Sequence, residues 1–335
     1  MSRTVILNAF GGDLASNLQV VERPIPTPRN GEVLIRVTCR PVNPADIISL
    51  TGGYPGFRPA TFPAVPGLEG CGVVHDNNGV EGVQTGQRVI VLFDAKNGNG
   101  SWQEYVAVPK ENIIPISDQI SDATASQFLV NPITVLGMLN EVNAPAGSYI
   151  LQTAAGSTLG RLVIAVAKHR GLKTINIVRR DEHVAELKAL GGDVVINSTK
   201  LDAGQLASEV LRETGGEHAW AAFDCVGGDL TREVMSCVRN GGSVLIFGAL
   251  GGITFTGGII DVTFRNVAIR GFWLSDYLHE IDAATRASVF GEALQLFSDQ
   301  QLVPHVGEAL PLERVLDAVR ITNEVGKAGK VLLTT

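Results

Sequence analysis

The stretch "SYILQTAAGSTLGRLVIAVAKHRG", residues 148–171, decides the fold. It opens with an apolar run typical of a buried strand, passes through five small residues, and continues as an amphipathic segment. In that segment the apolar residues Leu159, Val163 and Val166 fall on one helical face, and Gly171 is a typical helix stop. The stretch therefore predicts a strand, a tight turn and a helix in direct succession.

The turn resembles the G-x-G-x-x-G fingerprint of dinucleotide-binding units, although two of the three glycines are replaced. The fingerprint positions hold Ala155, Ser157 and Gly160. Small residues can serve the first two positions, while Gly160 keeps the one that packs helix against strand. The helix N-terminus still attracts an anion. We therefore predict a cofactor-binding turn, the alternative being a helix start with small packing residues; the turn consists of Ala155, Gly156, Ser157, Thr158, Leu159 and Gly160.

The end of the next strand indicates which cofactor the turn would bind. The segment "KTINIVRR" runs into Arg179 and Arg180, and the first carboxylate is Asp181. An NAD-specific unit ends this strand with an acid that holds the ribose hydroxyls, whereas a guanidinium binds a 2′-phosphate. The pattern therefore predicts NADPH, the alternative being a solvated loop at a helix entry.

The rest of the chain predicts two different architectures. Up to about residue 120 the sequence is rich in β signals; in "EVLIRVTCR", residues 32–40, Arg36 and Arg40 should face away from the buried side. From residue 121 helical segments, broken at Pro132, are followed by apolar strands alternating with amphipathic helices. Such alternation predicts a parallel sheet covered on both faces.

The totals exclude several classes of protein. The chain has 335 residues with 45% hydrophobic content and a net charge of -7, which argues against nucleic-acid or membrane-surface partners. The four cysteines form no C-x-x-C pair, so neither a disulfide framework nor a zinc knuckle is indicated. With no signal peptide and no membrane span in the pattern, we expect a cytoplasmic protein.

Several further motifs give the chain a family resemblance. The segments "NPADI", "PGLEGCGVV", "VNPIT", "AAGSTLG" and "RGFWLSDY" follow one another as they do in the medium-chain dehydrogenase/reductase superfamily. Within it the chain is most similar to the 2-enoyl thioester reductases, with the NADPH:quinone oxidoreductases close behind. The resemblance implies a GroES-like, β-rich catalytic domain, residues 1–120 with 300–335, and a doubly wound Rossmann domain, residues 121–299. It also implies that the cofactor and the substrate lie in the cleft between them.

The resemblance further implies that this chain binds no metal. Zinc-dependent members have a cysteine where this chain has Asn43, and a histidine where it has Leu68, before Glu69. Their four-cysteine lobe is missing as well. Since zinc sites need several preorganised nitrogen or sulfur ligands, we predict metal-independent chemistry.

Candidate catalytic and pocket residues follow from the same resemblance. Tyr54, in "LTGGYPGF", would be the acid or the group that polarises the carbonyl; its alternative role is an aromatic lid. Asn43 would donate to Tyr54 or to the substrate, the alternative being a turn residue before Pro44. Thr134 would approach the nicotinamide carboxamide, the alternative being a helix start. Trp102 would line the substrate pocket, and Phe272 and Trp273 would lie near both nicotinamide and acyl chain, although core packing is an alternative for all three aromatics.

The predicted activity is NADPH-dependent reduction of an activated C=C bond, most plausibly a trans-2-enoyl thioester of coenzyme A or acyl carrier protein. Two alternatives stay open: an NADPH:quinone oxidoreductase and a non-catalytic NADPH-binding sensor. The partner would be a small molecule or an acyl thioester. Segment 251–273 contains apolar β signals and glycines, which suggest a homodimer formed through edge strands of the cofactor domain. The alternative is that these are simply the last internal strands.

Overall fold

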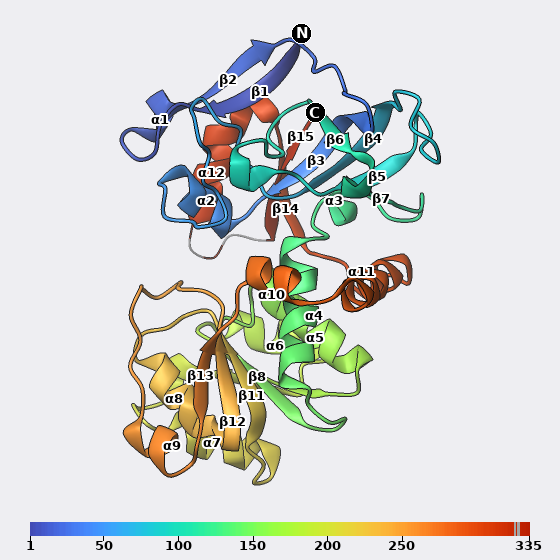
Figure 1. The fold of residues 1–335 in the computed structure, drawn as a ribbon. Coiled ribbons are helices and arrows are strands. Elements are labelled where there is room, and N and C mark those ends of the chain that lie inside the picture. The colour runs from blue at the N-terminus through green and yellow to red at the C-terminus, as the bar shows by residue number, and fades with distance from the viewer. Residues whose placement is uncertain (325, 327–328) are drawn as a thin grey trace. The chain divides into compact units, whose positions relative to one another are not determined.

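The chain folds into two compact units (Figure 1). The computed structural model describes residues 1–324, 326 and 329–335. The first unit comprises Met1–Val130 with Leu294–Thr335, and the second Asn131–Ala293. The boundaries expected at 120 and 300 therefore lie at 130 and 294. Helix α3 (Asp122–Ala125) stays with the first unit because the Asp122 carboxylate accepts hydrogen bonds from Thr38 at 2.6 Å and from Arg88 at 2.5 Å.

The first unit is built on a seven-stranded sheet in the order β14-β15-β3-β4-β5-β7, with β6 paired to β3. All pairings in it are antiparallel except that of β14 with β15. Its strands are β3 (Glu32–Val42), β4 (Gly70–Asp76), β5 (Arg88–Val91), β6 (Tyr105–Pro109), β7 (Ile113–Pro115), β14 (Val306–Pro311) and β15 (Lys330–Thr334). A separate hairpin sheet consists of β1 (Ser2–Leu7) and β2 (Leu18–Arg23).

Short helices connect these strands. They are α1 (Leu14–Asn17), α2 (Pro44–Leu50) and α12 (Val315–Asn323), with single 3-10 turns at η1 (Ala95–Asn97), η2 (Lys110–Asn112) and η4 (Leu312–Arg314). Helix α12 and strand β15 share one apolar core with β1 and Trp102. The valine-rich faces of β3, β4, β5 and β6 form a second core. The C-terminal segment therefore completes a domain that the first 130 residues begin.

Arg40 lies in the interior of this unit, contrary to the alternation of β3. Arg36 is exposed as expected, but Arg40 is fully buried. Its guanidinium donates to Thr335 Oγ1 at 2.7 Å and to the Gln103 carbonyl at 3.0 Å. Burial lowers the pKa of Arg40 to about 10. The polar face of β3 is thus covered at its end by the last residues of the chain, which local alternation did not reveal.

The second unit contains a six-stranded, wholly parallel sheet in the order β10-β9-β8-β11-β12-β13. Its strands are β8 (Tyr149–Gln152), β9 (Lys173–Val178), β10 (Val194–Asn197), β11 (Ala219–Asp224), β12 (Val238–Ile246) and β13 (Ala268–Gly271). The order runs outward from β8 in both directions, so the sheet is doubly wound and reverses between β8 and β11. This confirms the predicted Rossmann-type sheet.

Helices lie on both sides of this sheet (Figure 1). They are α4 (Val130–Val142), α5 (Thr158–His169), α6 (Glu182–Ala189), α7 (Leu206–Thr214), α8 (Leu230–Cys237), α9 (Ile259–Thr263), α10 (Leu274–Glu280) and α11 (Ala283–Ser298), with a 3-10 turn at η3 (Ser198–Lys200). The predicted helix break at Pro132 was wrong, because α4 runs through it. A proline is tolerated in the first turn, where its missing N–H has no intrahelical partner.

Strand β13 is the outer edge of the parallel sheet, and an apolar segment precedes it. Only residues 268–271 of the segment 251–273 are strand, so its apolar β signals were read too broadly. Residues 259–263 instead form α9. Ile253 is 98% exposed and Phe264 is 80% exposed. The second unit therefore presents an uncovered apolar surface beside an edge strand.

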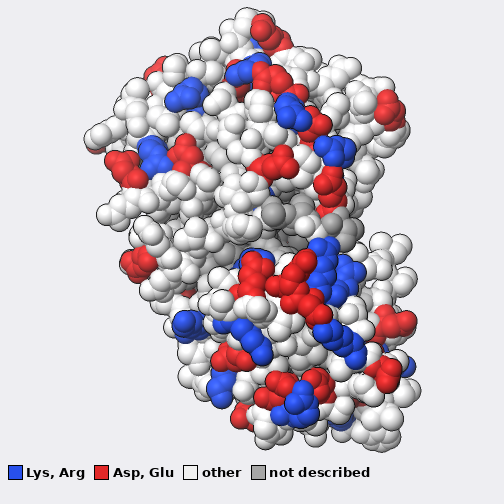
Figure 2. Space-filling model, turned by 180° about the vertical axis from the view of Figure 1, so that it is seen from behind, with Lys and Arg blue, Asp and Glu red and all other residues white. Residues whose placement is uncertain are grey.

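The charge pattern of the surface is mixed. On the face shown in Figure 2, acidic and basic side chains are interspersed, with no broad patch of one sign. Across the residues that the structure describes, no helix has the length and apolar character needed to span a membrane.

Candidate cofactor and substrate site

The turn between β8 and α5 has the backbone geometry of a cofactor cradle. Ser157 is the N-cap of α5, and its Oγ accepts the Gly160 N–H at 3.1 Å. The sharp bend falls on Ala154, at φ +48°. Because Ser157 Oγ accepts only one N–H, further N–H groups of the first turn of α5 have no intrahelical partner and are available to an anion.

Gly160 is required for packing. A Cβ atom at Gly160 would lie 2.5 Å from the Ala155 carbonyl oxygen, far inside van der Waals contact. Gly160 and Ala155 are both buried, whereas Gly156, Ser157, Thr158 and Leu159 are half-buried. Of the six predicted residues, two therefore hold helix against strand and four line the accessible side of the turn.

The end of β9 carries the predicted pair of cations. Arg179 is exposed, and no ion pair joins it to any residue that the structure describes. Arg180 pairs with Glu182 at 3.1 Å. The Asp181 carboxylate is engaged by Lys200 Nζ at 2.7 Å and by Asn197 Nδ2 at 2.9 Å. The residues that follow β9 thus fit a phosphorylated ribose, with Arg179 as the available cation.

Asn43 is buried and has partners other than those predicted. It is the N-cap residue of α2 and is 1% exposed. Its Nδ2 donates to Glu69 Oε1 at 3.0 Å, and its Oδ1 accepts from Lys330 Nζ at 2.5 Å. The predicted hydrogen bond from Asn43 to Tyr54 stays a prediction. The amide bridges a buried carboxylate and a buried ammonium group.

Four hydrogen bonds from backbone N–H groups to two carboxylates extend this bridge into a network that joins four segments. Glu69 Oε2 accepts the N–H groups of Leu129 and Val130 at 2.9 and 2.8 Å, just where α4 begins. Asp46 Oδ2 accepts the Asn43 N–H at 2.7 Å, and its Oδ1 accepts the Leu68 N–H at 3.0 Å. We call Asn43, Asp46, Glu69 and Lys330 the buried network.

Burial is the largest cause of the shifted pKa values in the buried network. It raises the pKa of Asp46 to about 7, against the opposing effect of the Asn43 N–H. Burial also raises the pKa of Glu69 and lowers that of Lys330. The nearby ammonium of Lys330 is the largest effect that favours the charged form of Glu69, whereas for Asp46 the Asn43 N–H contributes more than Lys330 does.

Arg58 stabilises the loop that carries Tyr54. The Arg58 guanidinium donates to the carbonyl oxygens of Gly52, Tyr54 and Phe57 at 3.1, 2.6 and 3.0 Å. The Tyr54 ring lies over Gly56, where a Cβ atom would be 2.4 Å from ring atom Cε1. The half-buried ring also packs against the core that contains Trp102. The loop after α2 therefore holds the tyrosine in a defined position.

The three predicted aromatics belong mostly to the core. Trp102 is fully buried in the core of the first unit, so its predicted place in a substrate pocket was wrong. Phe272 is 6% exposed and packs against Tyr277 and Gly137 of α4. Trp273, half-buried, is the N-cap residue of α10. Only Trp273 keeps the accessibility that contact with a ligand requires.

Thr134 lies in the second turn of α4 and is buried. Within the first unit the structure brings together Asn43, the start of α2 and the tyrosine loop. Within the second it brings together the turn 154–160, Arg179 and α6. Sequence reasoning missed Lys330 and Asp46 in the buried network, and no spacing pattern links residue 330 to residue 43.

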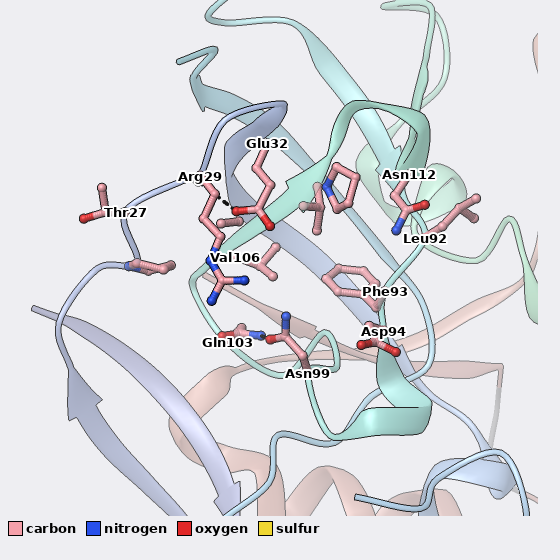
Figure 3. A pocket seen from close by; sticks show the side chains of 14 residues that line it. Thr27, Arg29, Glu32, Leu92, Phe93, Asp94, Asn99, Gln103, Val106 and Asn112 are labelled. Carbon is pink, nitrogen blue, oxygen red and sulfur yellow. Dashed lines mark hydrogen bonds between the residues drawn. The ribbon is translucent and has the colours of Figure 1, made fainter. Parts of the chain in front are cut away.

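Two cavities lie away from the predicted site residues. One of about 700 Å³ in the first unit is shown in Figure 3. There Phe93, Val106 and Gln103 form the walls, and Arg29 and Glu32 stand at one side. A second cavity, of about 600 Å³, lies between α6, β10 and α7. Neither is lined by a residue predicted for the site.

Two family models match the chain. The model described as an alcohol dehydrogenase GroES-like domain matches residues 29–118, and that described as a zinc-binding dehydrogenase matches residues 158–290. The mitochondrial enoyl-[acyl-carrier-protein] reductase of Arabidopsis thaliana is 31% identical over 98% of this chain and 86% of its own. The chain belongs to the medium-chain dehydrogenase/reductase superfamily. The predicted pairing of a GroES-like domain with a Rossmann domain is confirmed.

Other members of the superfamily are similar over much of the chain. The mitochondrial enoyl-[acyl-carrier-protein] reductase of Caenorhabditis elegans is 32% identical over 74% of this chain and 70% of its own. The solved structure of a Bacillus thuringiensis protein assigned as an NADPH:quinone reductase has a TM-score of 0.88 and 31% identity, covering 100% of this chain and 99% of that one. Both enoyl reductases are named as mitochondrial, and the cytoplasmic location expected here stays a prediction.

The zinc-binding description of the superfamily model bears on the metal question. Among the described residues, no three His, Cys, Asp or Glu side chains are grouped closely enough to hold a metal ion. Asn43, which stands where the resemblance places a zinc-ligating cysteine, donates a hydrogen bond to Glu69 instead. Metal independence stays a prediction.

Proposed function

We propose that the protein reduces the C=C bond of a 2-enoyl thioester with NADPH, adding hydride at the β-carbon and a proton at the α-carbon. The observation that carries this proposal is the likeness to an enoyl-[acyl-carrier-protein] reductase over 98% of the chain at 31% identity. The thioester handle is coenzyme A or acyl carrier protein. Both present the same conjugated carbonyl to the protein.

The cofactor would be held by the second unit. The accessible residues Gly156, Ser157, Thr158 and Leu159 would receive the pyrophosphate at the start of α5. Arg179, exposed and without an ion pair in the described chain, would bind the 2′-phosphate, and Arg180 would add positive charge. The Asp181 carboxylate, occupied by Lys200, leaves no acid for the ribose hydroxyls of NADH. These features support NADPH over NADH.

Bound NADPH supplies the hydride. The protein must then stabilise the negative charge that develops on the substrate and deliver a proton to it. Negative charge develops on the thioester oxygen as the β-carbon is reduced, so a hydrogen-bond donor is needed there. We assign that donor, and the proton delivered to the α-carbon, to the Tyr54 hydroxyl. Thr134 would orient the nicotinamide carboxamide. Asn43 serves by anchoring α2, which leads into the tyrosine loop, because its amide is committed to the buried network.

Quinone reduction is the second candidate. It is favoured by the 31% identity to the Bacillus thuringiensis protein assigned as an NADPH:quinone reductase. A quinone takes a hydride without protonation at carbon, so it would not depend on Tyr54. The third possibility, a sensor that binds NADPH without turning over a substrate, has no observation in its favour.

A substrate comparison with NADPH tests the proposal. Crotonyl-CoA and a small benzoquinone would be offered separately, with NADPH oxidation followed by absorbance and the thioester product by mass spectrometry. We expect kcat/KM for crotonyl-CoA to exceed that for the quinone by at least about ten-fold, a difference of ~1.4 kcal/mol in transition-state stabilisation. The opposite ratio would favour the quinone candidate, and no turnover of either would favour the sensor.

We also propose that the protein forms a homodimer through β13 and the apolar surface before it. Strand β13 has an unpaired edge in the sheet, and an exposed edge is a template for pairing. The apolar side chains beside it would be covered by a second copy; they are Leu250, Ile253, Phe255, Ile259, Ile260, Val262 and Phe264. So many exposed apolar side chains within fifteen residues of sequence favour an interaction site over ordinary solvent-facing surface.

A further inference from the structure

The first turn of α6 covers one side of the predicted phosphate turn. The His183 ring lies so close to Gly156 that a Cβ atom there would be 2.8 Å from ring carbon Cδ2 and 3.0 Å from Nε2. The carbonyl oxygen of Gly156 also accepts a hydrogen bond from Arg161 Nε at 3.2 Å. Two nitrogen-bearing side chains, from α5 and α6, therefore flank the turn at Gly156.

Glu186 holds both side chains. Its Oε1 pairs with Arg161 Nη1 at 2.6 Å, and its Oε2 lies 3.3 Å from His183 Nδ1. The hydrogen bond from Arg161, with that from His183, lowers the pKa of Glu186 to about 2, so the carboxylate is ionised. An ionised acceptor favours the tautomer with hydrogen on Nδ1. The other ring nitrogen, Nε2, is thus left beside Gly156.

The position of His183 connects it to the predicted cations. Its backbone N–H donates to the Arg180 carbonyl at 3.3 Å, so α6 begins directly from the pair of arginines that ends β9. Its side chain is 25% exposed and can reach a ligand. Its charged side-chain partner is Glu186, which also pairs with Arg161. Arg179 and the Arg180–Glu182 pair stand next to it in sequence.

We propose that His183 is a second recognition group for the 2′-phosphate of the cofactor, and that it acts in its protonated form. The inference rests on the proposed use of NADPH. With Nδ1–H directed to Glu186, a neutral imidazole would turn the lone pair of Nε2 toward the phosphate and repel it. A proton on Nε2 converts that nitrogen into a charged donor. An imidazole gains this proton within the pH range 5 to 8.

Equilibrium binding of NADPH and NADH, followed by cofactor fluorescence at pH 6.0 and pH 8.5, tests the inference. The variants are His183→Gln, Arg179→Ala and, as a matched control, His169→Gln at the other end of α5. For His183→Gln we expect NADPH affinity to fall about five-fold or more at pH 6.0 and less than two-fold at pH 8.5. NADH affinity should change less than two-fold at both pH values, and the control should behave as wild type.

Proton uptake on binding provides a second readout. Calorimetry of NADPH binding at pH 7 in two buffers of different ionisation enthalpy should give a smaller proton uptake for His183→Gln than for the wild type. Equal losses of NADPH and NADH affinity would assign His183 to the pyrophosphate instead and overturn the inference. A loss that is the same at both pH values, or no loss, would also overturn it.

Failure of the inference is distinguishable from failure of the proposed function. If the wild type prefers NADPH and Arg179→Ala removes that preference while His183→Gln does nothing, only the role of His183 is wrong. If the wild type binds NADH as tightly as NADPH, the cofactor proposal fails and the role of His183 fails with it.

Discussion

Among single residues, Arg179 carries the proposed preference for NADPH. It is the exposed cation that follows β9, whereas Arg180 is paired with Glu182. Replacing Arg179 with Ala should raise the KM for NADPH about ten-fold or more, since a hydrogen bond to a charged group contributes ~1.5–3 kcal/mol. The KM for NADH should change less than two-fold. Steady-state kinetics with both cofactors measures these KM values. The control variant is Arg29→Ala, in the other unit. Equal use of NADPH and NADH by the wild type would contradict the assignment.

Tyr54 carries the proposed proton transfer. Tyr54→Phe keeps the ring over Gly56 and removes only the hydroxyl. We expect kcat on an enoyl thioester to fall ~10²-fold or more, the usual scale for a positioned acid, while NADPH affinity stays within two-fold. Quinone reduction should fall much less. The control is Tyr105→Phe in β6; a loss below five-fold on the thioester would make Tyr54 a lid.

Residue identity alone predicted accessible charges better than it predicted aromatics. Arg179 could be inferred because a carboxylate is missing from one definite position of a strand–helix unit. Trp102 and Phe272 could not be assigned, since an aromatic side chain suits a pocket and a core equally, and only the fold shows both to be buried. Asn43 was predicted as a site position, but its hydrogen-bond partner Lys330, 287 residues away in sequence, could not be predicted.

At the scale of elements, the alternation of β8, α5 and β9 was predictable because apolar periodicity and turn chemistry agree there. The break expected at Pro132 was wrong because proline is compatible with a first helical turn, and the Glu69 carboxylate begins α4 at Val130 by accepting its N–H. Within the apolar β signals of segment 251–273, the strand β13 covers only Ala268–Gly271, because apolar residues at an uncovered surface carry the same signal as buried ones.

The buried network gives a prediction at this scale, because it ties α2, β4, α4 and β15 together. Lys330→Met removes the cation and leaves Asp46 and Glu69 buried without one. The variant should lose about 3–5 kcal/mol of unfolding free energy at pH 8, the usual cost of removing one partner of a buried pair. Urea unfolding measures this, with the exposed Lys96→Met as the control.

The pH dependence of this loss follows from the raised carboxylate pKa values. Asp46 has a pKa of about 7 in the folded protein against an ordinary 3.8, so the folded state binds more protons between these values. Its stabilising contribution is therefore present at low pH and is lost as pH rises through 7. The Lys330→Met variant should accordingly be less destabilised at pH 5.5 than at pH 8. A loss below 1 kcal/mol at pH 8, or one that is independent of pH, would contradict this account.

For the whole molecule, the composition of the two units depends on the last strand, β15, which pairs with β3 of the first unit. The C-terminal residues return to the first unit through α12 and β15, so a chain that is β-rich at its start closes its core only at its end. Composition and alternation predicted the two architectures. The boundaries at 130 and 294 depend on tertiary contacts such as Asp122 with Arg88, which no local pattern encodes.

The proposed dimer is tested by light scattering at micromolar concentration. We expect the mass of two chains for the wild type. Phe264→Glu should shift the equilibrium toward the monomer, because a carboxylate replaces an apolar side chain that a second copy would bury. Val303→Glu, at an exposed apolar position of the first unit, is the matched control. A wild-type monomer would rule out the dimer.

The fate of isotopic label in the product tests the central claim, reduction of an enoyl thioester, most directly. Crotonyl-CoA would be reduced with NADPH in deuterated water, and separately with each stereoisomer of 4-deuterated NADPH in ordinary water, with the position of deuterium read by NMR. We predict solvent deuterium at the α-carbon of butanoyl-CoA and cofactor deuterium, from one stereoisomer only, at the β-carbon. Absence of butanoyl-CoA while a quinone is turned over, or solvent deuterium at the β-carbon, would contradict the account.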